Sequence, residues 1–465
     1  MRSRRSSSAS SPSVPTTDGG RRLNSARSWL VFGGAVLAYV VGVTQRTSFG
    51  VAGVEATHRF DVAAATISTV AVVQIVVYAA LQIPVGILAD RVGPRRLIIA
   101  GALFMAAGQA LLAVAPAFGF VVAARMLVGA GDAMTFVSVI RLLPNWFGGR
   151  ILPQLAQWVG MLGQLGQLIA AVPFALILGL AGWTPALLLA SGLSILAGAV
   201  VVAVVRAGEP PPLTSPIPSD GLLRQLGATL RRPGTQLAFW VHLVGGTGTS
   251  AMALMWGYPF LTAGLGLDVG VAAGIFSLIV VGQLVAGPVV GALVARYPLR
   301  RSNVVLAVVA AIVAPLLLVS LWPGTPPLLL VSALFFALGM GGPGSLVGFD
   351  VARSFNPSHA LGSASGIVNT GGFIGGFVAV LGMGVVIDAV RAAGGGGALY
   401  TLDAFRLAFL VPVVIILAGV TGLLIARRRT RRRMYELEGI EIAPLWVALF
   451  RARSRRRPSP PSSAE

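Results

Sequence analysis

The 465-residue sequence contains no cysteine and no lysine. Without cysteine, the chain cannot form disulfides, thiolate metal sites or a cysteine nucleophile. Without lysine, it cannot carry the GxxxxGK[ST] loop that binds ATP phosphates. The only histidines are His58, His242 and His359, which are too scattered to form a metal cluster or a catalytic pair. We therefore expect no metal, no cofactor and no enzymatic activity.

Charged residues are also scarce, at 11% of the chain, whereas 55% of the residues are hydrophobic and the mean hydropathy is +0.84. These values are typical of an integral membrane protein. Crossing the hydrocarbon layer takes about 20 apolar residues per helix. The sequence predicts twelve such spans, at 29–52, 64–89, 96–115, 118–143, 153–179, 184–205, 236–262, 270–295, 303–322, 327–349, 361–388 and 404–426.

The net charge of +20 comes from arginine alone, and the arginines follow the predicted topology. If the N-terminus is cytosolic, only Arg46, Arg59, Arg125, Arg391 and Arg406 lie away from the cytosolic side. This is the bias of membrane proteins toward positive cytosolic loops, and it predicts a cell-membrane protein with both termini in the cytosol. This bias explains the positive net charge, so we expect no nucleic-acid partner. Arginine clusters at 21–27 and 427–433 are expected to attract anionic lipids.

Proline and polar residues divide the chain. A proline-rich stretch, EPPPLTSPIPSDG, follows the sixth predicted span and is typical of a linker. The expected organisation is a basic tail (1–27), an N-terminal six-helix bundle (28–206), a cytosolic linker (207–234), a C-terminal six-helix bundle (235–426) and a second basic tail (427–465). Within the second tail, the apolar stretch at 442–450 is too short to span a membrane and is interpreted as either interfacial or disordered.

A loop sequence occurs twice, as GILADRVGPRR from Gly86 and as GALVARYPLRR from Gly291. Five identical residues recur 205 positions apart, which indicates two related halves. In transporters built from parallel repeats, the substrate lies near the midplane between the halves. The second copy has Ala295 where the first has Asp90. If this carboxylate helps to close the transporter on one side, we expect that gate to be asymmetric, with its carboxylate in the N-terminal half alone.

The first loop resembles the signature loop of the major facilitator superfamily, and RMLVGAGDA, with Arg125, Gly129 and Gly131, is similar to the arginine-glycine motif of that family. The resemblance covers about residues 29–426. It implies an all-α membrane protein with twelve transmembrane helices in two pseudo-symmetric six-helix bundles. It also implies a secondary active transporter that works by alternating access. We expect it to act as a monomer.

The loop carboxylate is the expected gate. Asp90 would contact either Arg141 or the start of the eleventh span near Gly362, and breaking this contact would let the transporter change its facing. The alternative is that these charges only set the topology. The full set of expected gating residues is Asp90, Arg91, Arg95, Arg141, Asp350 and Arg353.

Three charged side chains are predicted within the membrane, where ionisable groups are costly enough to indicate function; Arg46 and Arg125 lie in its outer half, and Asp132 lies well inside a span. Arg46 is a candidate ligand for a solute carboxylate or phosphate; alternatively, it reaches the outer headgroups or pairs with Glu55. Arg125 is a second candidate. Asp132 is the candidate proton-coupling group, because a poorly solvated carboxylate takes up a proton more readily than one in water; alternatively, it forms a structural pair with an arginine or caps a backbone.

Uncharged polar side chains supply the remaining candidates for solute binding. Each could instead form a hydrogen bond between helices. The stretch GGTGTS at 245–250 is expected either to loosen the seventh span and expose backbone groups or to allow close helix packing through its small residues. The uncharged candidates are Gln74, Tyr78, Gln157, Gln164, Thr247 and Asn369.

The function predicted from these features is proton-coupled uptake of a small polar or anionic organic solute. The first alternative is a proton-driven drug or metabolite exporter. It is disfavoured because the fifth span has Gly160, Gly163 and Gly166 but lacks the Gly-Pro pair of the drug antiporters of that family. The other alternative is a membrane sensor that transports nothing.

Overall fold

A computed structural model describes residues 23–62, 64–205, 219–394 and 401–439, and every secondary-structure element in these ranges is a helix. Twelve helical segments in the described ranges are long and apolar enough to cross a membrane. They coincide with the twelve predicted spans. The protein is therefore an all-α membrane protein, as predicted.

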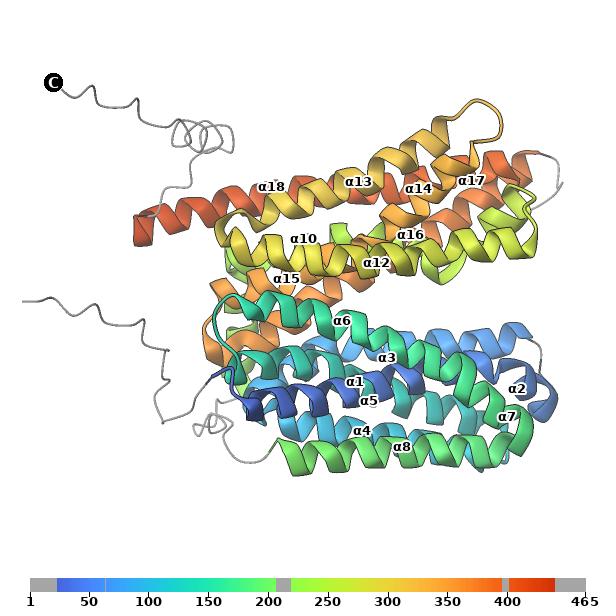
Figure 1. The fold of residues 1–465 in the computed structure, drawn as a ribbon, viewed down its shortest axis with the longest axis horizontal. Helices are drawn as coiled ribbons and strands as arrows, with labels where there is room; N and C mark the ends of the chain where they lie inside the picture. The colour runs from blue at the N-terminus through green and yellow to red at the C-terminus, as the bar shows by residue number, and fades with distance from the viewer. Residues whose placement is uncertain (1–22, 63, 206–218, 395–400, 440–465) are drawn as a thin grey trace, which may run out of the picture.

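The N-terminal half forms one layer of Figure 1 and the C-terminal half the other. The helices of the N-terminal half are α1 (Ala26–Val51), α2 (Gly53–Phe60), α3 (Ala64–Arg91), α4 (Pro94–Ala113), α5 (Phe118–Trp146), α6 (Ile151–Ile169), α7 (Ala175–Ala181) and α8 (Trp183–Val204). Those that follow are α9 (Ser219–Arg231), α10 (Pro233–Ala251), α11 (Gly257–Pro259), α12 (Val269–Arg296), α13 (Arg301–Leu321), α14 (Leu328–Gly339), α15 (Gly341–Phe355), α16 (Leu361–Ala393), α17 (Leu402–Ala408) and α18 (Leu410–Glu438). Short π- and 3₁₀-helical turns join some of them, at Ala170–Phe174, Met252–Trp256, Phe260–Gly264, Pro298–Arg300 and Ser358–Ala360.

Helix α1 begins and α18 ends at the same end of the molecule (Figure 1). The turns between α3 and α4 and between α12 and α13 lie at that end too, and they carry the arginines of the duplicated loop. We call it the arginine-rich end.

The two halves meet through α3 and α16 on one side and through α6 and α12 on the other. Glycine permits the closest approach. A methyl group on Gly86 of α3 would overlap the backbone carbonyl of Gly362 in α16, and one on Gly287 of α12 would overlap the side chain of Met161 in α6. The interface is therefore specified by small residues that let helix backbones come together.

Two segments differ from the expected organisation. Part of the expected linker is the helix α9, which packs against α10 and α16. The last span was expected to end at 426, but α18 continues to Glu438. Arginine is a good helix former, and the helix stops only where Gly439 adopts a left-handed conformation with φ of 64°. The apolar stretch at 442–450 lies outside the described residues.

Of the two interpretations of the stretch at 245–250, close helix packing is confirmed and loosening of the helix is wrong. Helix α10 is regular from Pro233 to Ala251, and a π-helical turn begins only at Met252. Within α10, Gly245 packs directly on the backbone of Ser345 in α15, where a methyl group would not fit. The small residues of this stretch therefore serve close helix packing, and they do not break the helix.

Candidate transport site

An ion pair lies inside the N-terminal half, between α1 and α5. The Nη1 atom of Arg46 donates to Oδ2 of Asp132 at 3.1 Å. The Asp132 side chain is fully buried, whereas 30% of the Arg46 side chain is exposed. The second carboxylate oxygen of Asp132, Oδ1, is buried without a hydrogen-bond partner. The pair is therefore partly open to solvent on the arginine side, and its carboxylate has one acceptor oxygen left over.

Two tyrosines accompany the Arg46 guanidinium. Its Cζ atom lies 5.9 Å from the ring centroid of Tyr78 in α3, and Tyr39 of α1 is near enough to interact with it electrostatically. Tyr39 lies seven positions before Arg46 and thus on the same helix face. That spacing could have identified Tyr39 from the sequence, where it was missed. The alternative pairing of Arg46 with Glu55 is wrong, because the carboxylate partner of Arg46 is Asp132.

Arg125 is completely buried beside this pair. It donates to the backbone oxygens of Gln45 (3.3 Å) and Arg46 (3.0 Å) in α1, and to the Gln74 side chain of α3. Its guanidinium also lies 4.9 Å from the ring centroid of Phe49. The structure thus brings Arg125 and Gln74 together, and Arg125 connects α1 with α3 through these hydrogen bonds. The only exposed guanidinium of the cluster belongs to Arg46.

The other uncharged candidates form hydrogen bonds between or within helices. Gln157 of α6 donates to the Pro343 carbonyl of α15 at 2.9 Å, across the two halves. Gln164 accepts a hydrogen bond from Gln167 in the same helix at 2.8 Å. Thr247 donates to the Leu243 carbonyl, one turn earlier in α10.

Asn369 of α16 reaches α3, where its Nδ2 atom donates to Oε1 of Gln82 at 2.6 Å. One turn away on each helix, the rings of Tyr78 and Phe373 lie 5.0 Å apart. These contacts connect the surroundings of Arg46 with the C-terminal half.

At the arginine-rich end, Asp90 holds the two halves together. Its Oδ1 accepts from the Gly362 backbone N–H at 2.7 Å, and its Oδ2 accepts from the N–H and hydroxyl of Ser363 at 2.8 and 2.9 Å. Nε of Arg141 donates to Oδ1 at 3.1 Å. Both partners expected for Asp90 are thus present together. The carboxylate meets the start of α16, where free N–H groups and the helix dipole favour an anion.

Arg141 adds a second contact across the halves, because its Nη2 atom donates to the Ser358 carbonyl at 2.8 Å. Ser358 precedes α16, so a guanidinium of α5 and a carboxylate of α3 both hold the start of one helix. Ser358 and Ser363 were not singled out in the sequence.

The Major Facilitator Superfamily family model matches residues 35–380. The chain is a member of the major facilitator superfamily. It is a membrane transporter, with the twelve helices in two halves that the resemblance implied. No curated protein that was compared with the chain matches it.

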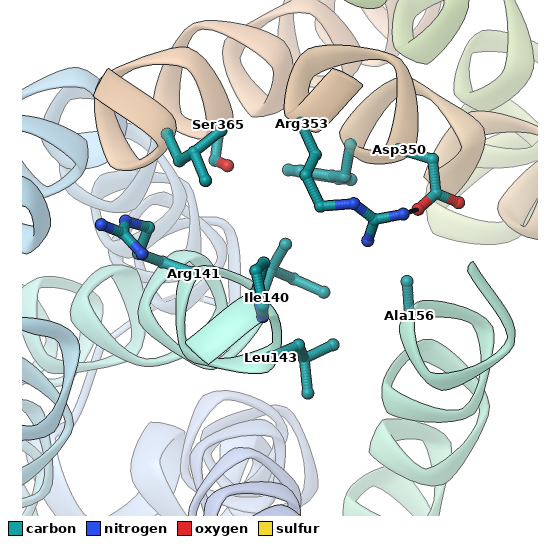
Figure 2. A pocket seen from close by; sticks show the side chains of 10 residues that line it. Ile140, Arg141, Leu143, Ala156, Asp350, Arg353 and Ser365 are labelled. Atoms are coloured by element: carbon teal, nitrogen blue, oxygen red, sulfur yellow. Dashed lines mark ion pairs between the residues drawn. The ribbon is translucent and has the colours of Figure 1, made fainter. Parts of the chain in front are cut away.

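In this transporter, a small cavity between the halves lies beside the Asp90 contacts (Figure 2). Arg141 lines it from α5, whereas Asp350 and Arg353 line it from α15. Figure 2 shows Arg353 extending to Asp350, and the two form an ion pair at 2.7 Å. Asp350 thus pairs within its own helix, whereas Asp90 bridges the halves.

The two other arginines expected at the gate have different surroundings. Arg95 donates to the Val202 carbonyl of α8 at 3.1 Å, which ties α4 to α8 within the N-terminal half of the transporter. Arg91 is half-buried at the end of α3. For Arg95, the structure therefore supplies a contact within one half, and Arg141 supplies the contact between halves.

Proposed function

We propose that this transporter carries a small organic anion into the cell together with a proton. We infer that it is a monomer of the plasma membrane. Its arginine-rich end is inferred to face the cytosol, because positively charged loops of membrane proteins lie mainly on that side. The observation that carries the proposal is the Arg46–Asp132 ion pair, with one exposed member and one fully buried member.

The chemistry of that pair couples a proton to an anion. When Asp132 is ionised, Arg46 is neutralised by it and has little attraction for a solute. When a proton from the outer solution binds Asp132, the carboxyl loses its charge and Arg46 becomes free to bind a solute carboxylate or phosphate with two parallel hydrogen bonds. Release of the proton on the cytosolic side returns Arg46 to Asp132 and expels the solute. The proton and the anion therefore move in the same direction.

The Asp90 contacts supply the gate for this cycle. In the described arrangement, Asp90 and Arg141 close the arginine-rich end by holding the start of α16. Opening toward the cytosol breaks several charge-assisted hydrogen bonds at once. A set of such bonds that breaks together favours two discrete arrangements, closed and open, as alternating access requires.

The test uses the purified chain in liposomes that contain the pH indicator pyranine. A thermal-shift screen of monocarboxylates, dicarboxylates and organic phosphates first identifies a ligand by its stabilisation of the folded state. Adding that ligand outside is expected to acidify the lumen and to cause its own accumulation when the lumen is alkaline. Accumulation that is insensitive to pH would refute the coupling. Anion export in exchange for protons would indicate the exporter instead, and the absence of flux under any gradient would indicate a sensor.

A further inference from the structure

A second pocket lies at the arginine-rich end of the C-terminal half, away from the interface between the halves. The first turn of α13, the end of α15 and the last turns of α18 surround it. Its polar lining consists of Arg301, Arg427, Arg431, Ser302 and Thr430. The proposed transport cycle uses none of these residues.

The pocket has an excess of positive charge. Among the described residues, the ion pairs nearby are Arg353 with Asp350 and Arg432 with Glu436, and no acidic side chain pairs with Arg427 or Arg431. Arg427 and Arg431 are both half-buried. Like charges that are partly removed from water repel one another, and a bound anion relieves this repulsion.

Arg301 is held in position from the other side. Its Nη1 atom donates to the Asp350 carbonyl at 3.0 Å and to the Ser354 hydroxyl at 2.5 Å. Its Nε atom is buried without a hydrogen-bond partner. The carboxylate of Asp350, with which Arg301 interacts electrostatically, is already paired with Arg353. A guanidinium fixed in this way, with one donor unused, suits an additional acceptor.

The start of α13 contributes a further favourable element. Arg300 occupies the N-cap position, and no side chain caps the helix. The backbone N–H groups of the first turn of a helix attract anions, and phosphate is a frequent ligand of such ends. The helix end and the arginines of α18 converge on the same pocket.

The apolar surroundings favour a lipid over a free ion. Leu417, Leu424, Arg427 and Arg431 are spaced to lie on one face of α18. Leu417 and Leu424 are 53% and 38% exposed, and Leu299 in the pocket lining is 47% exposed. An exposed apolar stripe that leads to basic side chains matches acyl chains followed by a charged headgroup.

We propose that this pocket binds a phosphate-type anion, and that its source is the headgroup of an anionic phospholipid in the cytosolic leaflet. The guanidinium groups of Arg301, Arg427 and Arg431 and the start of α13 hold the phosphate, while the acyl chains follow the exposed leucines of α18.

The test uses the full chain in an uncharged detergent, stripped of lipid. Phosphatidylglycerol is titrated and the unfolding temperature is measured, with phosphatidylcholine of the same acyl chains as the neutral comparison. We expect phosphatidylglycerol to stabilise the protein and phosphatidylcholine to do so at least about tenfold less effectively. Inorganic phosphate at millimolar concentration separates the two sources. Equal stabilisation by inorganic phosphate would retain the anion site but overturn its assignment to a lipid.

Two double variants with the same change in charge locate the effect. Arg427→Gln with Arg431→Gln removes pocket arginines, whereas Arg428→Gln with Arg429→Gln removes two exposed arginines of the same helix outside the pocket lining. The first is expected to raise the half-saturating lipid concentration about tenfold or more, and the second to leave it within about twofold. Equal losses, or no loss in the pocket variant, would overturn the proposal. Replacing Arg427 and Arg431 by lysine keeps both positive charges and should restore most of the lipid binding. Such a recovery would assign the weaker lipid binding of the glutamine variant to the lost charge and not to misfolding.

Discussion

The N-terminal half carries Arg125 and Asp132 well inside the membrane-spanning helix α5, whereas the charged residues of the C-terminal half lie toward the ends of its helices. Arg46, Arg125 and Asp132 form one buried cluster between α1 and α5. The spans of the second half contain no acidic residue or arginine between their ends, from α10 through α14. The duplicated loops differ in the same sense, because Asp90 bridges the halves and Ala295 cannot. The two halves thus differ in where their charges lie, and in the proposed cycle the N-terminal half supplies the ion pair and the gate carboxylate.

The largest expected effect comes from removing the exposed cation of the cluster. Arg46→Gln should lower solute uptake at least about a hundredfold, because the solute loses its charged partner and Asp132 is left buried without one. The measurement is uptake into proteoliposomes at saturating pH gradient. Arg391→Gln, an exposed arginine in the C-terminal half, is the matched control and should retain uptake. To separate function from folding, Arg46→Gln with Asp132→Asn should regain thermal stability without regaining uptake. Normal uptake by the Arg46→Gln variant would contradict the proposal that the N-terminal half binds the solute through Arg46.

A bulkier residue at the closest contact between the halves should have the next largest effect. Gly86→Val places side-chain atoms where the Gly362 carbonyl lies, so the arginine-rich end cannot close. We expect uptake to fall about tenfold or more, since one state of the cycle is lost. In α8, Gly192 has open space beside it, and Gly192→Val is the control with the same change in residue type. Similar loss in both variants would mean that the effect is general destabilisation.

Removing the charge of the gate should shift its equilibrium. Asp90→Asn weakens the hydrogen bonds from Gly362, Ser363 and Arg141, each worth about 1 kcal/mol or more. Because the natural chain lacks cysteine, a single Ala156→Cys in the cavity of Figure 2 reports opening directly by its rate of maleimide labelling.

We expect the labelling rate of the Ala156→Cys variant to rise severalfold when Asp90→Asn is added. The control is Asp268→Asn, an exposed carboxylate that precedes α12. An unchanged rate in the Asp90 variant would refute the gate.

The smallest expected effect concerns the neutral contact between the halves. Asn369→Leu removes one hydrogen bond to Gln82, and the unpaired amide that remains costs about 1–3 kcal/mol. Replacing Gln82 by leucine as well should recover much of this loss in thermal stability. A double-mutant cycle with no interaction energy would show that Asn369 does not couple the halves.

The sequence predicted the fold well because spans depend on local composition. Twelve apolar runs correspond to twelve helical segments, and the partners of Asp90 followed from its place at a helix end. The Arg46–Asp132 pair was harder, because its members are 86 positions apart and their pairing depends on how α1 and α5 are rotated. The stretch 245–250 left two interpretations open, since a glycine that packs against a neighbouring helix and one that breaks a helix look identical in sequence.

The central claim is that Asp132 is the group that carries the proton. The most direct measurement compares two activities of Asp132→Asn in the same proteoliposomes: solute counterflow, which needs binding and alternating access only, and solute-induced proton influx, read by entrapped pyranine. We predict that counterflow is retained and that proton influx and gradient-driven accumulation are lost, with Asp403→Asn, an exposed carboxylate in an ion pair with Arg406, behaving as the natural protein. Proton influx that persists in the Asp132→Asn variant would contradict the account.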